Sequence, residues 1–170
     1  MKPIQYLLVG LPYSGKTMLA KELVKKLGFA HIDIDELKFA KGFKDVSDDD
    51  VPDKVWDEIF KEADEMIAKY LNEGKNIVNE YAWVTKEWRD RARKAAAGFE
   101  TKIIYVNAPH EVIWKRWEEN EKANNRFHLS KEEVERAIKE FEPLEKDENF
   151  ILYDQTIPVG NWIAKNFPQP

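Results

Sequence analysis

Short apolar runs alternate along this chain with longer segments in which apolar residues recur every three or four positions. The short runs predict strands at 4–9, 29–34, 76–78, 102–106 and 150–153. The amphipathic segments predict helices over about 15–27, 53–71 and 85–97, from 109, from 130, and over 158–166, with a short helical segment at 35–38. Strands and helices that alternate in this way are typical of a parallel sheet covered on both faces, so we expect an α/β fold, a three-layer α/β/α sandwich with a five-stranded parallel sheet.

Capping residues support several of these boundaries. Gly28 and Gly98 stand where helices are expected to end, because glycine readily adopts the left-handed conformation of a helix C-terminus. Thr85 is a candidate N-cap. Ser130 with Glu133 forms a capping box, so a new helix is expected there. We find no repeat or long linker and expect 1–170 to be a single domain.

The segment between the first predicted strand and helix matches the phosphate-binding pattern G-x-x-x-x-G-K-[ST]. Its residues are Gly10, Leu11, Pro12, Tyr13, Ser14, Gly15, Lys16 and Thr17. Glycines allow a backbone to wrap a phosphate, and the amides of a helix N-terminus attract the anion. We expect these eight residues and Met18 to contact a nucleotide, with Lys16 at the β- and γ-phosphates and Thr17 at Mg²⁺. Tyr13 stands where many such loops have another glycine.

Ligands of parallel α/β sheets bind beyond the carboxyl ends of the strands, where this chain has several carboxylates. Asp33 and Asp35 follow the second predicted strand, and a period of two places them on the same side. Phosphoryl transfer to a hydroxyl requires one carboxylate near the metal and one near the acceptor. Helix capping is the other role open to a strand-end aspartate. Asn79 and Glu80 follow the third strand, so the metal role falls to Asp33 or to Glu80.

Basic residues late in the chain predict a lid. Arg116 and Arg126 flank a polar run, and we expect 117–130 to close over the phosphates, since arginine binds phosphate with a planar fork. Ordinary surface ion pairs are the alternative. Gln155 is expected at the edge of the adenine site.

Other polar and aromatic residues have weaker indications. Lys38 is either a site residue or a surface lysine. Tyr81 and Trp83 are candidates for lining an acceptor pocket, and no role is assigned to the isolated His31. Three arginines of one helix are expected to form a solvated face: Arg89, Arg91 and Arg93.

Composition narrows the possible partners. The 170 residues carry a net charge of −5, so nucleic acid is an unfavourable main partner. The 43% apolar and 35% charged residues indicate a globular protein, and the absence of cysteine excludes disulfides. Neither a signal peptide nor a membrane span is expected. A cytoplasmic protein, either a monomer or a homodimer, fits these features.

The motif residues together resemble the small P-loop kinase family, and the similarity runs along most of the chain. Asp33-Ile34-Asp35 resembles the D-x-D of shikimate kinases, and Asp35 to Lys38 resembles the D-D-x-R of polynucleotide 5′-hydroxyl kinases. Chloramphenicol phosphotransferases, zeta-type toxins and AAA-type ATP-binding kinases are similar as well. The resemblance implies a nucleoside monophosphate kinase-like fold with a small helical lid, using ATP and Mg²⁺. It also implies that Thr17 and Asp33 serve the metal and that Asp35 serves the acceptor.

We therefore expect transfer of the γ-phosphoryl group of ATP to a hydroxyl of a small molecule. Lys16, Asp35, Arg116 and Arg126 are the predicted catalytic residues. Two alternatives remain open: the acceptor is a polynucleotide 5′-hydroxyl, or the chain is an ATP-binding regulatory module without transfer.

Overall fold

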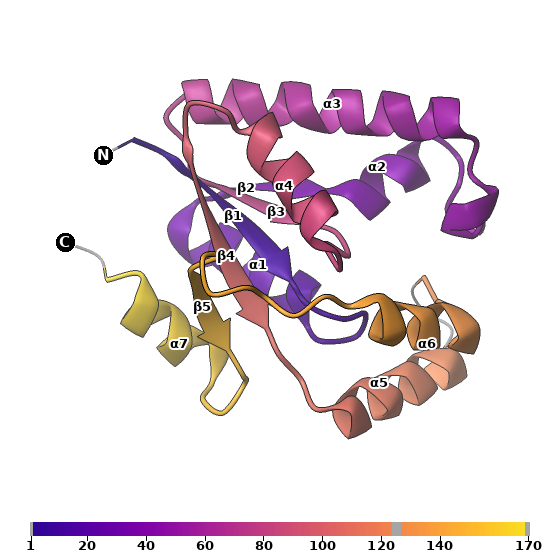
Figure 1. Ribbon diagram of the computed structural model, residues 1–170. Helices are drawn as coiled ribbons and strands as arrows, with labels where there is room; N and C mark the ends of the chain where they lie inside the picture. The colour runs from indigo at the N-terminus through magenta and orange to yellow at the C-terminus, as the bar shows by residue number, and fades with distance from the viewer. Residues whose placement is uncertain (1, 124–126, 169–170) are drawn as a thin grey trace.

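A five-stranded parallel sheet forms the centre of the computed structural model, which describes residues 2–123 and 127–168 (Figure 1). The strands lie in the order β2-β3-β1-β4-β5. Their bounds are β1 (Ile4–Val9), β2 (Ala30–Asp33), β3 (Ile77–Glu80), β4 (Glu100–Val106) and β5 (Phe150–Tyr153). Because β1 lies in the middle of the sheet, the loop that follows it lies at the centre of the carboxyl edge.

Helices cover both faces of the sheet. They are α1 (Lys16–Leu27), α2 (Ile34–Ala40), the 3₁₀ helix η1 (Asp48–Asp50), α3 (Asp53–Asn72), α4 (Lys86–Ala95), α5 (His110–Ala123), α6 (Lys131–Glu140) and α7 (Val159–Asn166). Helices α3 and α4 lie over one face, and α1 and α7 over the other, while α5 and α6 extend beyond the carboxyl edge (Figure 1). Across the described residues, no helix is both long and apolar enough to cross a membrane.

Two apolar cores result from the alternation of side chains along the strands. Leu7 and Val9 of β1 point to the α3–α4 side, where they pack with Ile59 of α3. Tyr6 and Leu8 point to the α1–α7 side. A sheet that is buried on both faces requires apolar residues at consecutive positions, which explains the run Tyr6 to Val9 in β1. The buried polar residue of this strand, Gln5, donates to Ala92 O and Thr101 Oγ1.

The predicted fold class and most element boundaries are confirmed. The predicted fifth strand coincides with β5, Gly28 is the C-cap of α1, and Thr85 is the N-cap of α4. The capping box at Ser130 is present.

Three local expectations were wrong. The second strand ends at Asp33, and Asp35 lies in the first turn of α2, so a period of two does not relate them. Most of the polar run that was expected to separate the lid arginines continues α5 as helix up to Ala123. Arg89 does not belong to a solvated face, since its exposed fraction is 0%.

A buried ion pair fixes the segment that leads into β5. Arg89 donates from Nε and Nη2 to the carboxylate of Glu148 at 2.8 and 2.7 Å, and Arg93 adds a third bond at 2.7 Å. Although burial opposes ionisation, the hydrogen bonds from these two arginines lower the pKa of Glu148 to about 2. The pair thus ties α4 to the chain just before β5.

We predict that Glu148→Gln lowers the free energy of unfolding by about 3 kcal/mol, because it leaves the Arg89 charge buried without its counter-ion. The lowered pKa means that wild-type stability from this pair is present above pH 4.5 and is lost as the pH falls toward 2. Urea titrations should therefore show that Glu148→Gln loses less stability than the wild type as the pH falls from 4.5 toward 2. Asp147→Asn, at an exposed neighbour, is the control and should change stability by less than about 1 kcal/mol. Equal effects of the two variants would contradict the prediction.

Candidate functional site

The loop after β1 has the backbone that a phosphate-binding loop requires. Gly15 has φ of 106°, a conformation that strongly favours glycine. At Gly10 an added Cβ would overlap the carbonyl oxygen of Val106 on the neighbouring strand β4. Both motif glycines are therefore required by geometry, one by its dihedral angle and one by the close approach of β4.

The N-terminus of α1 fits an anion. Its N-cap is Gly15, which contributes no side-chain hydrogen bond, and its first turn contains no acidic residue. Within the part of the chain that the structure describes, no side-chain cap binds the first amides of this helix. Unsatisfied N–H groups at the positive end of a helix dipole are a suitable site for phosphate.

Lys16 lies against the loop that precedes it. Its Nζ donates to the carbonyl oxygens of Gly10 and Leu11 at 2.9 and 3.0 Å. Burial lowers the pKa of Lys16, while the nearby charges of Glu80 and the two aspartates oppose that shift. The sequence-predicted lysine is thus a buried amine placed beside the carboxylates at the sheet edge.

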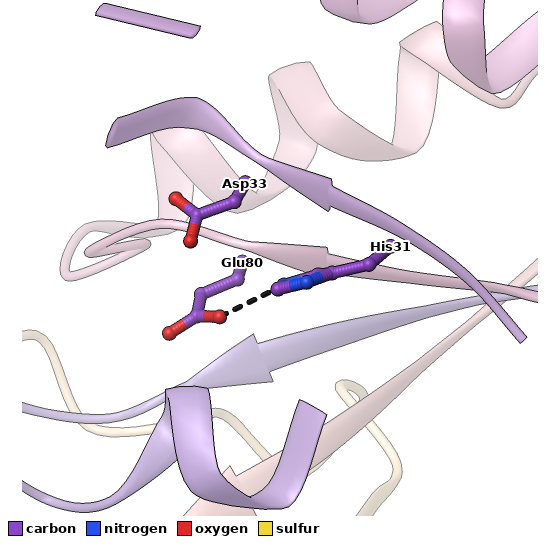
Figure 2. A group of neighbouring side chains, drawn as sticks. All are labelled: His31, Asp33 and Glu80. Carbon is purple, nitrogen blue, oxygen red and sulfur yellow. Dashed lines mark hydrogen bonds and ion pairs between the residues drawn. The ribbon is translucent and has the colours of Figure 1, made fainter. Parts of the chain in front are cut away.

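A group of possible metal ligands lies next to the loop, at the carboxyl ends of β2 and β3 (Figure 2). His31, Asp33 and Glu80 each offer a ligand atom, and these atoms lie within 4.8 Å of one another. Thr17 Oγ1 donates to Glu80 Oε1 at 2.5 Å, and His31 Nε2 donates to Glu80 Oε2 at 2.9 Å. Glu80 therefore links the threonine of the phosphate-binding loop to β2.

Asp33 and Glu80, the two candidates for holding the metal, both belong to this group, but their hydrogen-bond partners differ. Asp33 Oδ1 caps α2 by accepting from the amides of Asp35 and Glu36 at 3.0 and 3.3 Å, so the capping role considered for it is present. Glu80 contacts Thr17 directly. Asn79 is buried and donates to Gln5 at 3.1 Å inside the sheet, away from this group.

The pKa values of these two carboxyl groups are shifted in opposite directions. Although burial opposes its ionisation, hydrogen bonds from His31 and Thr17 lower the pKa of Glu80. Burial and the charge of Glu80 raise the pKa of Asp33 to about 6. Carboxylate and hydroxyl oxygens are the donors that Mg²⁺ prefers, so Thr17, Glu80 and Asp33 fit that ion.

Asp35 is the most perturbed carboxyl of the site. Burial raises its pKa to about 7, with contributions from the charges of Asp33 and Asp48. The charges of Lys16 and Lys38 oppose the shift. A carboxylate whose pKa lies near neutrality is suited to accept a proton.

Arg116 and Gln155 form hydrogen bonds with the backbone of the phosphate-binding loop. Arg116 Nη1 donates to the carbonyls of Tyr13 and Ser14, both at 3.0 Å, and its Nη2 donates to Gln155 Oε1 at 2.7 Å. Gln155 Nε2 in turn donates to Ser14 O at 2.8 Å. The structure thus brings both predicted residues to the loop, where they bind its backbone.

Tyr13 connects the loop to the lid region. Its φ is 61°, the left-handed conformation that explains why glycine is common at this position. Its hydroxyl accepts from the amide of Leu129 at 3.1 Å and lies 3.3 Å from His128 Nδ1. Arg126, the second predicted lid arginine, falls outside the described residues.

Lys38 and Tyr81 both bind Asp48, close to the charge of Asp35. Lys38 is 1% exposed and donates from Nζ to Asp48 Oδ1 at 2.7 Å and to Val46 O at 2.6 Å. Tyr81 donates to Asp48 Oδ2 at 3.3 Å. Lys38 is therefore no surface lysine. Trp83 is buried in the core, and Met18 is 45% exposed just after the loop.

Sequence reasoning missed the contributions of His31, Asp48 and the Tyr13 hydroxyl. A signal for His31 was available, because it stands two residues before Asp33 and therefore on the same face of β2. Asp48 carried no comparable signal, because it lies in a polar stretch whose path the sequence does not specify.

The loop, the parallel sheet and the carboxylates at its edge define a P-loop protein of the small-kinase type. A family model described as an AAA domain matches residues 6–144, so the chain belongs to that family. No curated protein matches the chain.

Several solved structures share the fold. A sugar kinase from Janibacter sp. HTCC2649 is 17% identical with a TM-score of 0.70, and the match covers 96% of this chain and 92% of that one. A gluconokinase from Sinorhizobium meliloti 1021 is 16% identical (TM-score 0.64, coverage 96% and 89%). The APS kinase of Mycobacterium tuberculosis, solved with AMPPNP and APS, is 16% identical (TM-score 0.66, coverage 97% and 95%). At these identities the likeness concerns the fold.

We predict that Asp35→Asn stabilises the metal-free protein at pH 8 by about 1–3 kcal/mol, because ionising a carboxyl with a raised pKa costs folding free energy. The folded pKa of about 7 lies above the ordinary value of 3.8, so the gain should shrink as the pH falls from 7 toward 4. Thermal unfolding in a chelator at both pH values measures it. Glu36→Gln, an exposed neighbour, is the control. A destabilised Asp35→Asn protein at pH 8 would contradict the assignment of a desolvated carboxyl.

Proposed function

We propose that this protein transfers the γ-phosphoryl group of ATP to a hydroxyl of a small molecule, with Mg²⁺. One observation carries the proposal. A buried carboxyl with a pKa near neutrality, Asp35, lies within electrostatic reach of the phosphate-loop lysine Lys16, which also responds to the charge of Glu80, the hydrogen-bond partner of Thr17. Phosphoryl transfer needs a phosphate cradle, a metal site and a proton acceptor side by side.

On the nucleotide side, the amides after Gly15 and the amine of Lys16 bind the β- and γ-phosphates. Lys16 exchanges its bonds to the carbonyls of Gly10 and Leu11 for phosphate oxygens. Arg116 and Gln155 keep the loop in shape by their bonds to Ser14. Met18 and Gln155 lie at the edges where the nucleoside is expected.

Thr17, Glu80 and Asp33 are the residues that would hold the metal in this proposal. When bound, Mg²⁺ neutralises charge that develops on the transferring group. His31 positions Glu80 through its 2.9 Å hydrogen bond.

On the acceptor side, Asp35 takes the proton of the attacking hydroxyl. The acceptor oxygen forms a bond to the γ-phosphorus while the bond from that phosphorus to the β–γ bridging oxygen breaks. ADP leaves with the bond electrons, and the proton moves to Asp35. Lys38 fixes Asp48 beside this position. The lid arginine Arg126 is proposed to join Arg116 in stabilising the phosphoryl group.

Small polyhydroxyl acceptors are favoured over polynucleotides. Two of the proteins that share the fold are named as kinases of small molecules, one as a sugar kinase and the other as a gluconokinase. The surface beyond Asp48 also carries acidic residues, among them Asp53 and Asp57, which would repel a phosphodiester backbone. A purely regulatory module is disfavoured by Asp35, because a desolvated carboxyl costs stability and calls for a chemical role.

We predict that ATP consumption by the purified protein with Mg²⁺ is stimulated by one class in a panel of hydroxyl acceptors. The panel spans neutral sugars, amino sugars, sugar acids, nucleosides and 5′-hydroxyl oligonucleotides. Lys16→Ala should lower the stimulated rate at least about 100-fold because it removes charge stabilisation of the transferring phosphate. Stimulation by oligonucleotides alone would replace the proposed acceptor class. ATP binding without stimulation by any compound would favour the regulatory module.

We predict that Asp35→Asn lowers the transfer rate by about 100-fold or more while leaving ATP affinity within about threefold, since a general base contributes about 10²–10⁴ in rate. Single-turnover transfer and calorimetric ATP binding measure the two quantities separately. Glu36→Gln serves again as the control. Transfer at the wild-type rate by Asp35→Asn would refute the assignment of the base.

A further inference from the structure

Residues of α3 and α4 line a groove of about 1170 Å³. These two helices lie on the face of the sheet opposite α1 (Figure 1). Its inner end is formed by Asp48 and Tyr81, which are hydrogen-bonded to each other at 3.3 Å. The charge of Asp48 acts on Asp35, and the charge of Asp35 acts on Tyr81. Asp48 and Tyr81 therefore connect the groove electrostatically to Asp35, and none of the described residues of the phosphate-binding loop lines the groove.

Four contiguous aromatic rings form an apolar surface in this groove. Phe60 stacks on Trp56 with ring centroids 5.8 Å apart and on Trp88 at 5.2 Å. Tyr81 packs against them edge-on, 6.3 Å from Trp88. Trp88 is 39% exposed, which is unusual for so large an apolar side chain. Phe60 is buried, so the exposed ring of Trp88 and the half-buried ring of Trp56 are the surfaces that suit the apolar faces of sugar rings and the flanks of protonated amines.

The groove is strongly acidic around these rings. Seven carboxylates line it against two basic side chains. Asp64 is paired with Arg91, Asp49 with Arg136 and Asp48 with Lys38. Within the described residues no ion pair engages the four other carboxylates, which are Asp53, Asp57, Glu65 and Glu87.

The two basic side chains, Lys61 and Arg91, leave an excess of carboxylates in the groove. Arg91 lies over the ring of Phe60, with its guanidinium carbon 4.1 Å from the ring centroid, and both of its terminal nitrogens donate to Asp64 at 3.1 and 3.0 Å. This stack is an example, inside the groove, of a cation bound by a ring face and a carboxylate together. A ligand cation placed on Trp88 beside Glu87, its neighbour on α4, would be bound in the same manner.

Because the groove carries an excess of negative charge, it favours a positively charged ligand. We propose that the α3–α4 groove binds the cationic part of the phosphoryl acceptor, and that this acceptor is a sugar or oligosaccharide carrying several protonated amines. The amines pair with Asp53, Asp57 and Glu87, the rings lie against Trp56 and Trp88, and one hydroxyl reaches Asp35. This inference rests on the proposed phosphoryl transfer for the role of the ligand, but its binding is separable from transfer.

Kanamycin, which bears four amines on three rings, is the probe, and its fully N-acetylated derivative is the matched neutral ligand. Calorimetry at low salt should detect kanamycin binding and should find the acetylated derivative at least tenfold weaker. The triple variant Asp53→Asn, Asp57→Asn, Glu87→Gln should also bind kanamycin at least tenfold more weakly. A control variant removes the same charge elsewhere: Glu22→Gln, Glu100→Gln, Glu111→Gln. It should bind kanamycin as the wild type does.

Trp88→Ala tests the aromatic contribution and should weaken binding about fivefold or more. Circular dichroism of each variant reports whether it folds. No binding of kanamycin, equal binding of the acetylated derivative, or equal weakening by the control variant would overturn the proposal.

The experiments distinguish a groove that does not bind the cationic ligand from a protein that does not transfer a phosphoryl group. Lys16→Ala should retain kanamycin binding while losing transfer, because none of the described residues of the phosphate-binding loop lines the groove. Kanamycin binding that depends on the groove, with no phosphorylation of any hydroxyl compound, would refute the proposed transfer and leave the groove assignment intact. Phosphorylation of neutral sugars by a protein that does not bind kanamycin would refute the groove assignment alone.

Discussion

The arrangement of the site depends on a crowding of negative charge at the carboxyl edge of the sheet. Asp33, Asp35 and Glu80 lie around Lys16, and burial makes their mutual repulsion strong. The three carboxyls respond differently because their hydrogen bonds differ. Glu80 receives bonds from Thr17 and His31 and stays ionised, whereas Asp33 and Asp35 have raised pKa values. One edge of a sheet thus holds an ionised carboxylate beside two carboxyl groups that have raised pKa values.

Different strands and helices fix the positions of these three carboxyl groups. Glu80 is the last residue of β3, so its direction is set by the pleat and by the neighbouring strand β2 that contributes His31. Asp33 ends β2 and caps α2, so Asp35 lies in the first turn of that helix, where its charge acts on Lys16. Because strand ends and a helix start fix these side chains, little loop flexibility is available to separate them.

The sequence predicted the fold and the phosphate-binding loop because both depend on local patterns. Apolar periodicity, Gly28, Thr85 and the Ser130 capping box are local signals, and the structure follows them. Contacts between distant segments were not accessible in this way. The bond of Thr17 to Glu80 and the burial of Arg89 against Glu148 join residues far apart in the chain. A buried arginine has the same local pattern as an exposed one, so only the tertiary partner distinguishes them.

The backbone of Tyr13 has a further consequence for how the two sides of the site communicate. A left-handed tyrosine costs about 1–2 kcal/mol relative to ordinary geometry, and the hydrogen bond from Leu129 helps to offset that cost. The segment before α6 and the phosphate-binding loop are therefore energetically coupled, because displacement of Leu129 removes one of the hydrogen bonds that stabilise the backbone of Tyr13. A glycine at this position would have no hydroxyl to provide this coupling.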